Sequence, residues 1–153
     1  AVEREVGGGA AEAVNVKAVL SRLYHERALR QAPGVPAPDI RLLGAAAHLP
    51  WPEAVRLVLL AHEMVLAAER AAPPGGLRAV LTFQQGGDHI LLQLDDNGVY
   101  GDQPLRMAAE IVTLASQALR GTLSPEASEH GHRLRYRFDW NAPARRQPAR
   151  KTP

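Results

Sequence analysis

The stretch LRAVLTFQQGGDHILLQLDDNG, residues 77–98, decides the fold of this chain. Two apolar runs, 77–83 and 89–94, flank the sequence QQGGD, whose glycines suit a tight turn between two strands. Apolar and polar residues alternate in the runs, as they do in strands that bury one face. The stretch therefore predicts a β-hairpin whose second strand ends at Asp95 and Asp96.

Helices are predicted before the hairpin. Residues 14–31 have apolar residues at helical spacing and end at APGVPAP, where three prolines stop a helix. Residues 53–72 follow Pro50 and Pro52, are apolar around most of their girth and stop at PPGG, which predicts a central buried helix. The residues expected on one stripe of the first helix are Val16, Val19, Leu20, Leu23, Arg27 and Leu29.

The remaining elements complete an order of helices and strands. Ile40, Leu42 and Leu43 suit a short strand between the two helices. Residues 104–119 predict a helix with proline in its first turn, and residues 122–140 predict a second hairpin. In its last strand, the apolar residues Leu134, Tyr136 and Phe138 are expected to face the core. The alternating residues Arg133, Arg135 and Arg137 are expected to form a basic, solvated face. This order predicts a two-layer α/β sandwich, a mixed sheet with helices on one face.

The composition indicates one ordinary globular domain. The chain has 153 residues, of which 46% are hydrophobic and 22% are charged, a usual globular balance. We expect a flexible linker at 1–13, which contains three consecutive glycines, the domain itself at 14–140, and a basic disordered tail at 141–153. The chain lacks Cys, which excludes disulfides and thiolate metal sites.

The sequence also suggests a cellular location. It contains no apolar run of the roughly 18 residues that a membrane span needs, and its start does not have the pattern of a signal peptide. We therefore predict a cytoplasmic protein. The net charge is +2, with the basic excess in the terminal ARRQPARKTP, and this balance does not indicate a nucleic-acid partner.

Candidate chemistry occurs in two places. His62 and Glu63 lie inside the apolar helix, where a carboxylate must be paired, line a cavity or lie on a solvated stripe. Asp96 ends a strand before Asn97 and Gly98. This ending is either an ordinary turn, in which Asn and Gly accept positive φ, or a ligand contact in which the carboxylate accepts a hydrogen bond from an exocyclic amine.

Other familiar motifs are absent. The sequence has no P-loop, no dinucleotide-binding G-x-G-x-x-G and no H-E-x-x-H motif. The six histidines do not indicate a metal site. His25 is expected to be a surface or packing residue, and His130 and His132 lie in the turn-like sequence EHGH.

Taken together, these pieces resemble a known domain. A buried helix with an acid in its middle, a hairpin, a D-x-G strand end, a helix and a final hairpin are similar to the catalytic, ATP-binding domain of bacterial sensor histidine kinases. This is the GHKL superfamily, with gyrase, chaperone and mismatch-repair ATPases. The resemblance covers roughly Val14 to Trp140. It implies the Bergerat-type α/β sandwich.

The resemblance assigns a position to each candidate on the buried helix. The family's N box, often close to N-E-L-V-T-N-A, is matched by HEMVLAA, residues 62–68. His62 then stands at a nucleotide-binding position, and Glu63 stands where the family's acid polarises the attacking group or a water. The second Asn, a Mg²⁺ ligand, is replaced by Ala67, whose methyl group cannot coordinate a cation that demands oxygen ligands.

The nucleotide-binding loops are matched in part. The G1 box D-x-G-x-G corresponds to DNGVY, residues 96–100, so that Asp96 falls on the adenine-binding aspartate and Gly98 on the first glycine. Tyr100 stands at the second glycine, where its side chain would crowd the backbone or fill the pocket mouth. In place of the Gly-rich G2 box, which cradles phosphates, Asp102 adds negative charge and Pro104 removes a donor N–H.

The resemblance implies three alternative functions. The first is a domain of two-component signalling with a degenerate nucleotide site, which binds ATP weakly through Asp96, does not favour Mg²⁺, and acts by binding a kinase, a response regulator or another signalling protein. The second is an active domain that binds ATP-Mg²⁺ and transfers the γ-phosphate to a histidine on another domain. The third is a scaffold reused for structure or oligomerisation. Loss of the metal ligand and of the phosphate cradle favours the first.

Overall fold

The computed structural model describes residues 13–34, 37–99, 113, 119–128 and 131–140. The predicted tail and the predicted linker, except Ala13, lie outside these residues, as does most of the predicted helix at 104–119. Their predictions therefore stay predictions. Of that helix, Thr113 is helical and Leu119 is buried.

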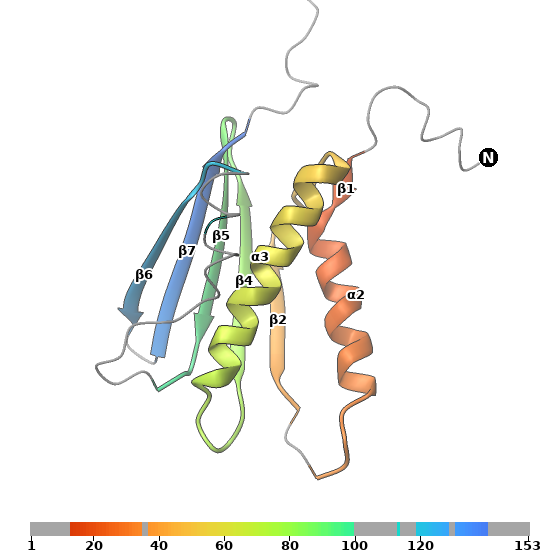
Figure 1. Cartoon of the computed structure of the whole chain (residues 1–153), viewed down its shortest axis with the longest axis vertical. Helices are drawn as coiled ribbons and strands as arrows, with labels where there is room; N and C mark the ends of the chain where they lie inside the picture. The colour runs from red at the N-terminus through yellow and green to blue at the C-terminus, as the bar shows by residue number, and fades with distance from the viewer. Residues whose placement is uncertain (1–12, 35–36, 100–112, 114–118, 129–130, 141–153) are drawn as a thin grey trace, which may run out of the picture.

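A mixed five-stranded sheet forms one layer of the molecule (Figure 1). β2 and β4 are parallel, and the remaining neighbours pair antiparallel. The predicted mixed sheet is confirmed. In spatial order the strands are β2 (Asp39–Gly44), β4 (Arg78–Gln85), β5 (His89–Asp96), β7 (Gly131–Asp139) and β6 (Thr122–Ser128).

The β4–β5 hairpin has the predicted place and slightly longer strands than predicted. The pairing runs from Gln85 opposite Ile90 to Ala79 opposite Asp96, and the Gly86 N–H donates to the His89 carbonyl over 2.9 Å at the turn. Asp96 is thus the last paired residue of β5, as the sequence predicted for the strand end.

Two helices are described next to the sheet, α2 (Val16–Leu29) and α3 (Trp51–Arg70). The Asn15 side chain accepts the Ala18 N–H and so caps α2, while Pro52 occupies the first turn of α3 without loss of a hydrogen bond. Both predicted helices are confirmed, with ends shifted by two residues. A short antiparallel pair, β1 (Val14–Asn15) with β3 (His48–Leu49), joins the starts of the helices and was not predicted.

The buried face of α2 differs from the predicted stripe. Val16, Leu20 and Tyr24 are buried, whereas Val19 and Leu23 are 41% and 36% exposed. Relative to the predicted stripe, the buried face of α2 is rotated towards Tyr24, whose ring packs beside His62 of α3. Leu29 at the end of α2 is also exposed.

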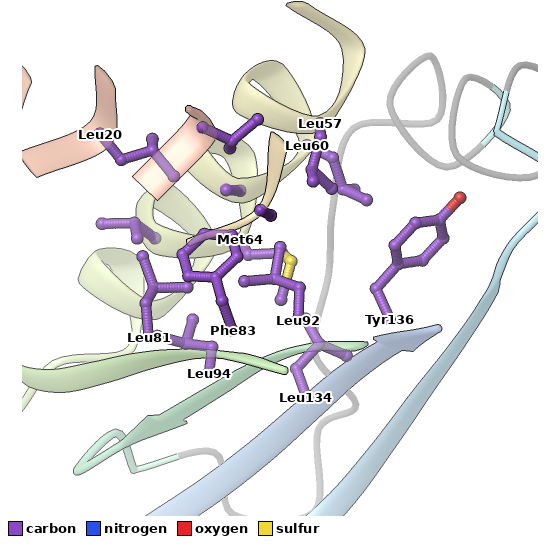
Figure 2. Packing of buried hydrophobic residues seen from close by; sticks show 14 of the residues in the cluster. Leu20, Leu57, Leu60, Met64, Leu81, Phe83, Leu92, Leu94, Leu134 and Tyr136 are labelled. Carbon is purple, nitrogen blue, oxygen red and sulfur yellow. The ribbon is translucent and has the colours of Figure 1, made fainter. Parts of the chain in front are cut away.

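The core lies between the helices and one face of the sheet (Figure 2). Alternate residues of β4, β5 and β7 point into it, and in Figure 2 Met64 of α3 lies beside Phe83 and Leu92. These side chains are almost wholly shielded from solvent. The two-layer α/β sandwich predicted from the order of elements is confirmed.

The second hairpin also follows its predicted alternation. In β7, Leu134, Tyr136 and Phe138 are buried, while Arg135 and Arg137 are exposed on the opposite face. Burial raises the pKa of the Tyr136 phenol to about 12. In the described part of the chain, no helix is both long and apolar enough to cross a membrane.

Candidate functional site

The alternation of β5 decides which of its two terminal carboxylates enters the covered side of the sheet. Asp96 has the same parity as Ile90, Leu92 and Leu94 and is 7% exposed. Asp95 points to the opposite face, where its Oδ1 accepts from Arg133 Nε at 2.6 Å. Asp95 is therefore a cross-strand ion-pair residue, whereas Asp96, the candidate from the sequence, points to the covered side of the sheet.

The Asp96 carboxylate is oriented by its own loop. Its Oδ1 accepts the backbone N–H of Gly98 over 2.7 Å, so the chain turns tightly around the side chain. Within the described residues, positive φ is found at Gly34, Gly44, Gly76 and Arg120, so the turn at Asn97 and Gly98 does not use the left-handed conformation considered from the sequence. The side-chain hydrogen bond holds the turn instead.

Asn97 fastens this loop to the rest of the domain. Its Oδ1 accepts the Arg78 N–H at 2.8 Å, and its Nδ2 donates to the Gly76 carbonyl at 3.2 Å. The next contact is made by Val99, whose N–H donates to the Ala71 carbonyl after the end of α3 over 2.8 Å. The loop is thus tied both to the start of β4 and to α3. The sequence marked Asn97 only as a turn residue.

His132 is a further candidate residue beside Asp96 that the sequence interpretation missed. It lies in β7 opposite Asp96 and is 8% exposed, with its Nδ1 4.0 Å from Asp96 Oδ2, an ion pair whenever the imidazole is protonated. It was predicted in a turn because of the glycine beside it. Alternate residues of a strand share a face, and His132 is two residues before Leu134, which places it on the inner face.

Gly131 permits this close pairing of β5 and β7. A Cβ atom at this position would overlap the Asp96 carbonyl oxygen and approach the Asn97 Cα to 2.9 Å. Both of these atoms belong to the backbone and cannot move aside as a side chain would. Glycine is therefore required at the point where β7 passes the Asp96 loop.

Glu63 lies on α3, and its side chain is 15% exposed. Its Oε2 is 3.5 Å from Arg70 Nη2, two helical turns further along. Ala67, one turn after Glu63, is buried. The helix rises about 12 Å over the eight residues from Glu63 to Ala71, the point at which the Asp96 loop contacts α3.

His62 faces α2. Its Nδ1 lies 3.1 Å from the Tyr24 hydroxyl, and the two rings are 5.9 Å apart. Burial, with a smaller contribution from Arg27, lowers the pKa of His62, and burial raises the pKa of Tyr24. Beside them Arg27 Nη2 pairs with Glu69 Oε1 at 2.6 Å. The structure thus places His62 in the contact between α2 and α3.

The remaining candidates can be placed in part. Tyr100, Asp102 and Pro104 lie outside the described residues. His25 is exposed, one of the alternatives expected for it. Among the described residues, no group of three or more His, Cys, Asp or Glu side chains is arranged to hold a metal ion.

Comparison with known proteins gives a consistent fold. No protein-family model and no curated protein matches the sequence. Solved structures do match: the blue-light activated histidine kinase of Erythrobacter litoralis EL346 at 18% identity and TM-score 0.63, and the ATP-binding domain of PrrB from Mycobacterium tuberculosis at 20% identity and TM-score 0.62. A third is the histidine kinase ThkA in complex with the response regulator TrrA, at 11% identity and TM-score 0.59.

These matches differ in the share of each protein that they cover. They include 88%, 85% and 91% of this chain, and 66%, 97% and 42% of the EL346 kinase, PrrB domain and ThkA chains, respectively. The chain thus spans nearly all of an isolated ATP-binding domain and a smaller share of the longer kinases. The arrangement of strands and helices is accordingly shared with this group of domains. The chain has the fold of the catalytic, ATP-binding domain of histidine kinases.

Proposed function

We propose that this chain is a domain of two-component signalling whose nucleotide site is degenerate and which acts mainly by binding a partner protein. The observation that carries the proposal concerns the residues around Glu63 on α3. Ala67 occupies the position that the family resemblance assigns to a Mg²⁺ ligand, and the neighbouring Glu63 is engaged by Arg70. Within this proposal the domain comprises residues 14–140, between a linker and a basic tail.

The chemistry of this end argues against efficient phosphoryl transfer. A methyl group supplies no oxygen to a cation that needs near-octahedral oxygen coordination. A carboxylate that faces a guanidinium is less available to a metal or a water, because it would have to exchange a charged partner for either. Metal and oriented-charge interactions are commonly worth several kcal/mol each in such transfers, so their loss removes most of the catalytic advantage.

A signalling protein is the proposed partner. Among the structures with this fold, ThkA was solved together with the response regulator TrrA, which supports a response regulator or a kinase as the class of partner. Cytoplasmic location is part of the proposal, since that is where such partners would be met.

A second candidate function is an active ATP-Mg²⁺ domain, and the Asp96 end favours it. The carboxylate is buried, oriented by Gly98 and anchored through Asn97, which is the preorganisation that recognition of an exocyclic amine requires. Under this alternative Glu63 would leave Arg70 when nucleotide binds. His62 would have no direct contact with the base, because it is engaged with Tyr24.

Calorimetric titration of the full chain with ATP and ADP, with and without Mg²⁺, separates the two candidates. The degenerate site predicts weak binding, in the millimolar range, that does not depend on Mg²⁺ and is lost in Asp96→Ala. Asp95→Ala is the matched control, because that carboxylate lies on the opposite face and should leave binding unchanged. Micromolar binding that requires Mg²⁺ would overturn the proposal and favour the active domain. If neither ATP nor ADP binds, the active domain is excluded, and partner binding and the structural scaffold are the functions that remain.

A gain-of-function variant sharpens the same test. Ala67→Asn supplies an amide oxygen one turn after Glu63, and we expect it to introduce a dependence of nucleotide affinity on Mg²⁺ if the rest of the site is intact. Because Ala67 is buried, the fold of the variant is checked by thermal unfolding before titration.

A further inference from the structure

The two edges of the sheet are chemically different. β6 at one edge has the sequence TLSPEAS, in which Pro125 lacks an N–H and Glu126 adds charge, so it is a poor template for a further strand. β2 at the other edge has the sequence DIRLLG and contains no proline. Among the described strands, none pairs with its outer side. Among the described residues, β2 is therefore the sheet edge better suited to strand addition.

The register shows which backbone groups of β2 are available. Asp39 and Ala45 donate their N–H groups to β4, to the carbonyls of Leu77 and Phe83. In a parallel ladder alternate residues face the neighbouring strand, so the N–H and C=O groups of Ile40, Leu42 and Gly44 face outward. Lys17 Nζ already donates to the Gly44 carbonyl at 2.7 Å, which demonstrates that donors reach this edge.

A groove is lined by residues of β2 and of α2. Figure 1 shows α2 beside β2. We call this groove the α2–β2 groove. Its volume is about 380 Å³, near the lower end of the range of small-molecule pockets, and its lining includes Lys17, Ser21 and Tyr24 of α2 and Asp39, Ile40 and Leu42 of β2. Ile40 and Leu42 are half-buried, and their side chains give the floor an apolar character.

The charges of the groove indicate the kind of occupant. Asp39 is 3.4 Å from Arg41, and Arg27 at the far end is paired with Glu69, so these charges are compensated. The ammonium of Lys17 meets only a neutral carbonyl among the contacts described for it. The groove is therefore left with a positive end beside Gly44, where an acidic side chain fits.

We propose that the α2–β2 groove binds an extended segment of a partner protein, which adds to β2 as a sixth strand. Its alternate side chains are small or apolar and face Ile40 and Leu42, and an acidic residue at one end faces Lys17. Main-chain hydrogen bonds to the outward groups of β2 supply affinity, and the groove supplies selectivity. This inference rests on the proposed partner-binding function, because the α2–β2 groove would be the surface to which the partner binds.

The test uses the ¹⁵N-labelled full chain and a seven-residue peptide of alternating valine and threonine with a terminal aspartate. At saturating peptide we expect the amide protons of Ile40 and Leu42 to exchange about tenfold more slowly, since bound chain protects them in proportion to occupancy. Amides of β6 serve as the internal control and should not change. Lack of protection at Ile40 and Leu42 with millimolar peptide overturns the proposal.

Two N-methylated peptides provide a matched control that leaves the protein untouched. In a paired strand only alternate N–H groups point to the neighbour. Methylation of one set of alternate amides should abolish protection, while methylation of the other set should preserve it. Equal binding of both peptides would mean that no strand is added, and the proposal would fail.

Variants on α2 test the charge. Lys17→Gln should weaken the acidic peptide about two- to fivefold, as expected for a solvent-exposed charge pair, and should not affect a peptide ending in threonine. Arg22→Gln, whose side chain is 83% exposed and pairs with Glu26, should change neither. Equal affinities of acidic and neutral peptides for the unmodified chain would overturn the charge assignment.

The nucleotide titration keeps this inference separate from the proposed function. Tight Mg²⁺-dependent ATP binding would overturn the degenerate site and leave strand addition standing. Failure of the peptides would remove strand addition and leave the degenerate site standing.

Discussion

Asp96 and Glu63 are the two carboxylates of the candidate site, and the chain surrounds them differently. Asp96 is buried, receives a backbone N–H and sits in a loop that Asn97 ties to two other elements. Glu63 is partly exposed and meets a cation from its own helix. The position of Asp96 is thus set by the end of a strand and by contacts with distant segments, whereas the ion pair described for Glu63 comes from its own helix and can be changed by a single substitution.

Among the variants that test this contrast, Gly131→Ala should lower the free energy of unfolding most, because the added methyl group forces β7 away from the Asp96 loop. The new Cβ would overlap the Asp96 carbonyl, and we expect the free energy of unfolding to fall by about 3 kcal/mol. Urea denaturation measures the change. Gly75→Ala is the matched control: no atom lies within 4 Å of its Cβ, so it should change stability by less than about 0.5 kcal/mol. Equal effects would mean that the close approach of β7 is not needed.

Asn97→Ala should have the next largest effect. It removes an acceptor from the Arg78 N–H and a donor from the Gly76 carbonyl, and a loss of about 2 kcal/mol is expected by urea denaturation. Asn97→Asp keeps the acceptor only, so its loss should be smaller. If both variants match the original chain, the loop is not held by this side chain and the Asp96 end is no more rigid than the Glu63 end.

Arg70→Gln tests the other end and should have a small effect. The pair with Glu63 involves a side chain that is 57% exposed, and such pairs contribute about 0.5 kcal/mol, less at high salt. Thermal unfolding at low and high salt measures it. Nucleotide affinity should not change if the site is degenerate. A tenfold gain in Mg²⁺-dependent affinity would identify Arg70 as the group that blocks a working Glu63.

His62→Gln is expected to have the smallest effect, confined to acidic pH. Because the pKa of folded His62 is lowered by burial, the unfolded chain takes up a proton first as pH falls. The stability contribution is therefore complete above the unfolded pKa of about 6.5 and is lost as pH falls from there towards the folded pKa. The original chain should lose more stability between pH 7.5 and 5.5 than His62→Gln. His25→Gln, at an exposed position, should behave like the original chain.

The parts of the fold that were predictable are those with a long periodic signal. Alternation over β4 and β5 predicted the hairpin, and the same signal predicted the two faces of β7. The β1–β3 pair, with two residues per strand, is too short to have a period. The buried face of α2 was predicted wrongly because the hydroxyl of Tyr24 has its hydrogen-bond partner, His62, on another helix. Spacing along one helix does not reveal such a contact.

The candidate site was predictable to a lesser degree, because it depends on contacts between distant segments. The roles of Asn97 and Gly131 follow from partners in β4 and β5. The sequence contained one signal for His132: it alternates in step with the buried residues Leu134 and Tyr136. The adjacent glycine led to the prediction of a turn instead. Resemblance located Asp96 and Glu63, and the pairing of Glu63 with Arg70 required the helix itself.

The opposite directions of Asp95 and Asp96 have a consequence for how this site can change over evolutionary time. A strand alternates strictly, so the loss or gain of one residue in the turn at Gly86 to Asp88 would shift β5 by one position along β4 and exchange its faces. Gln93 and Asp95 would then enter the core, and Asp96 would leave it. Substitutions can change the candidate site gradually, but a one-residue shift of this register would turn the whole apolar face of β5 away from the core, so the direction of Asp96 is preserved together with the register of the hairpin.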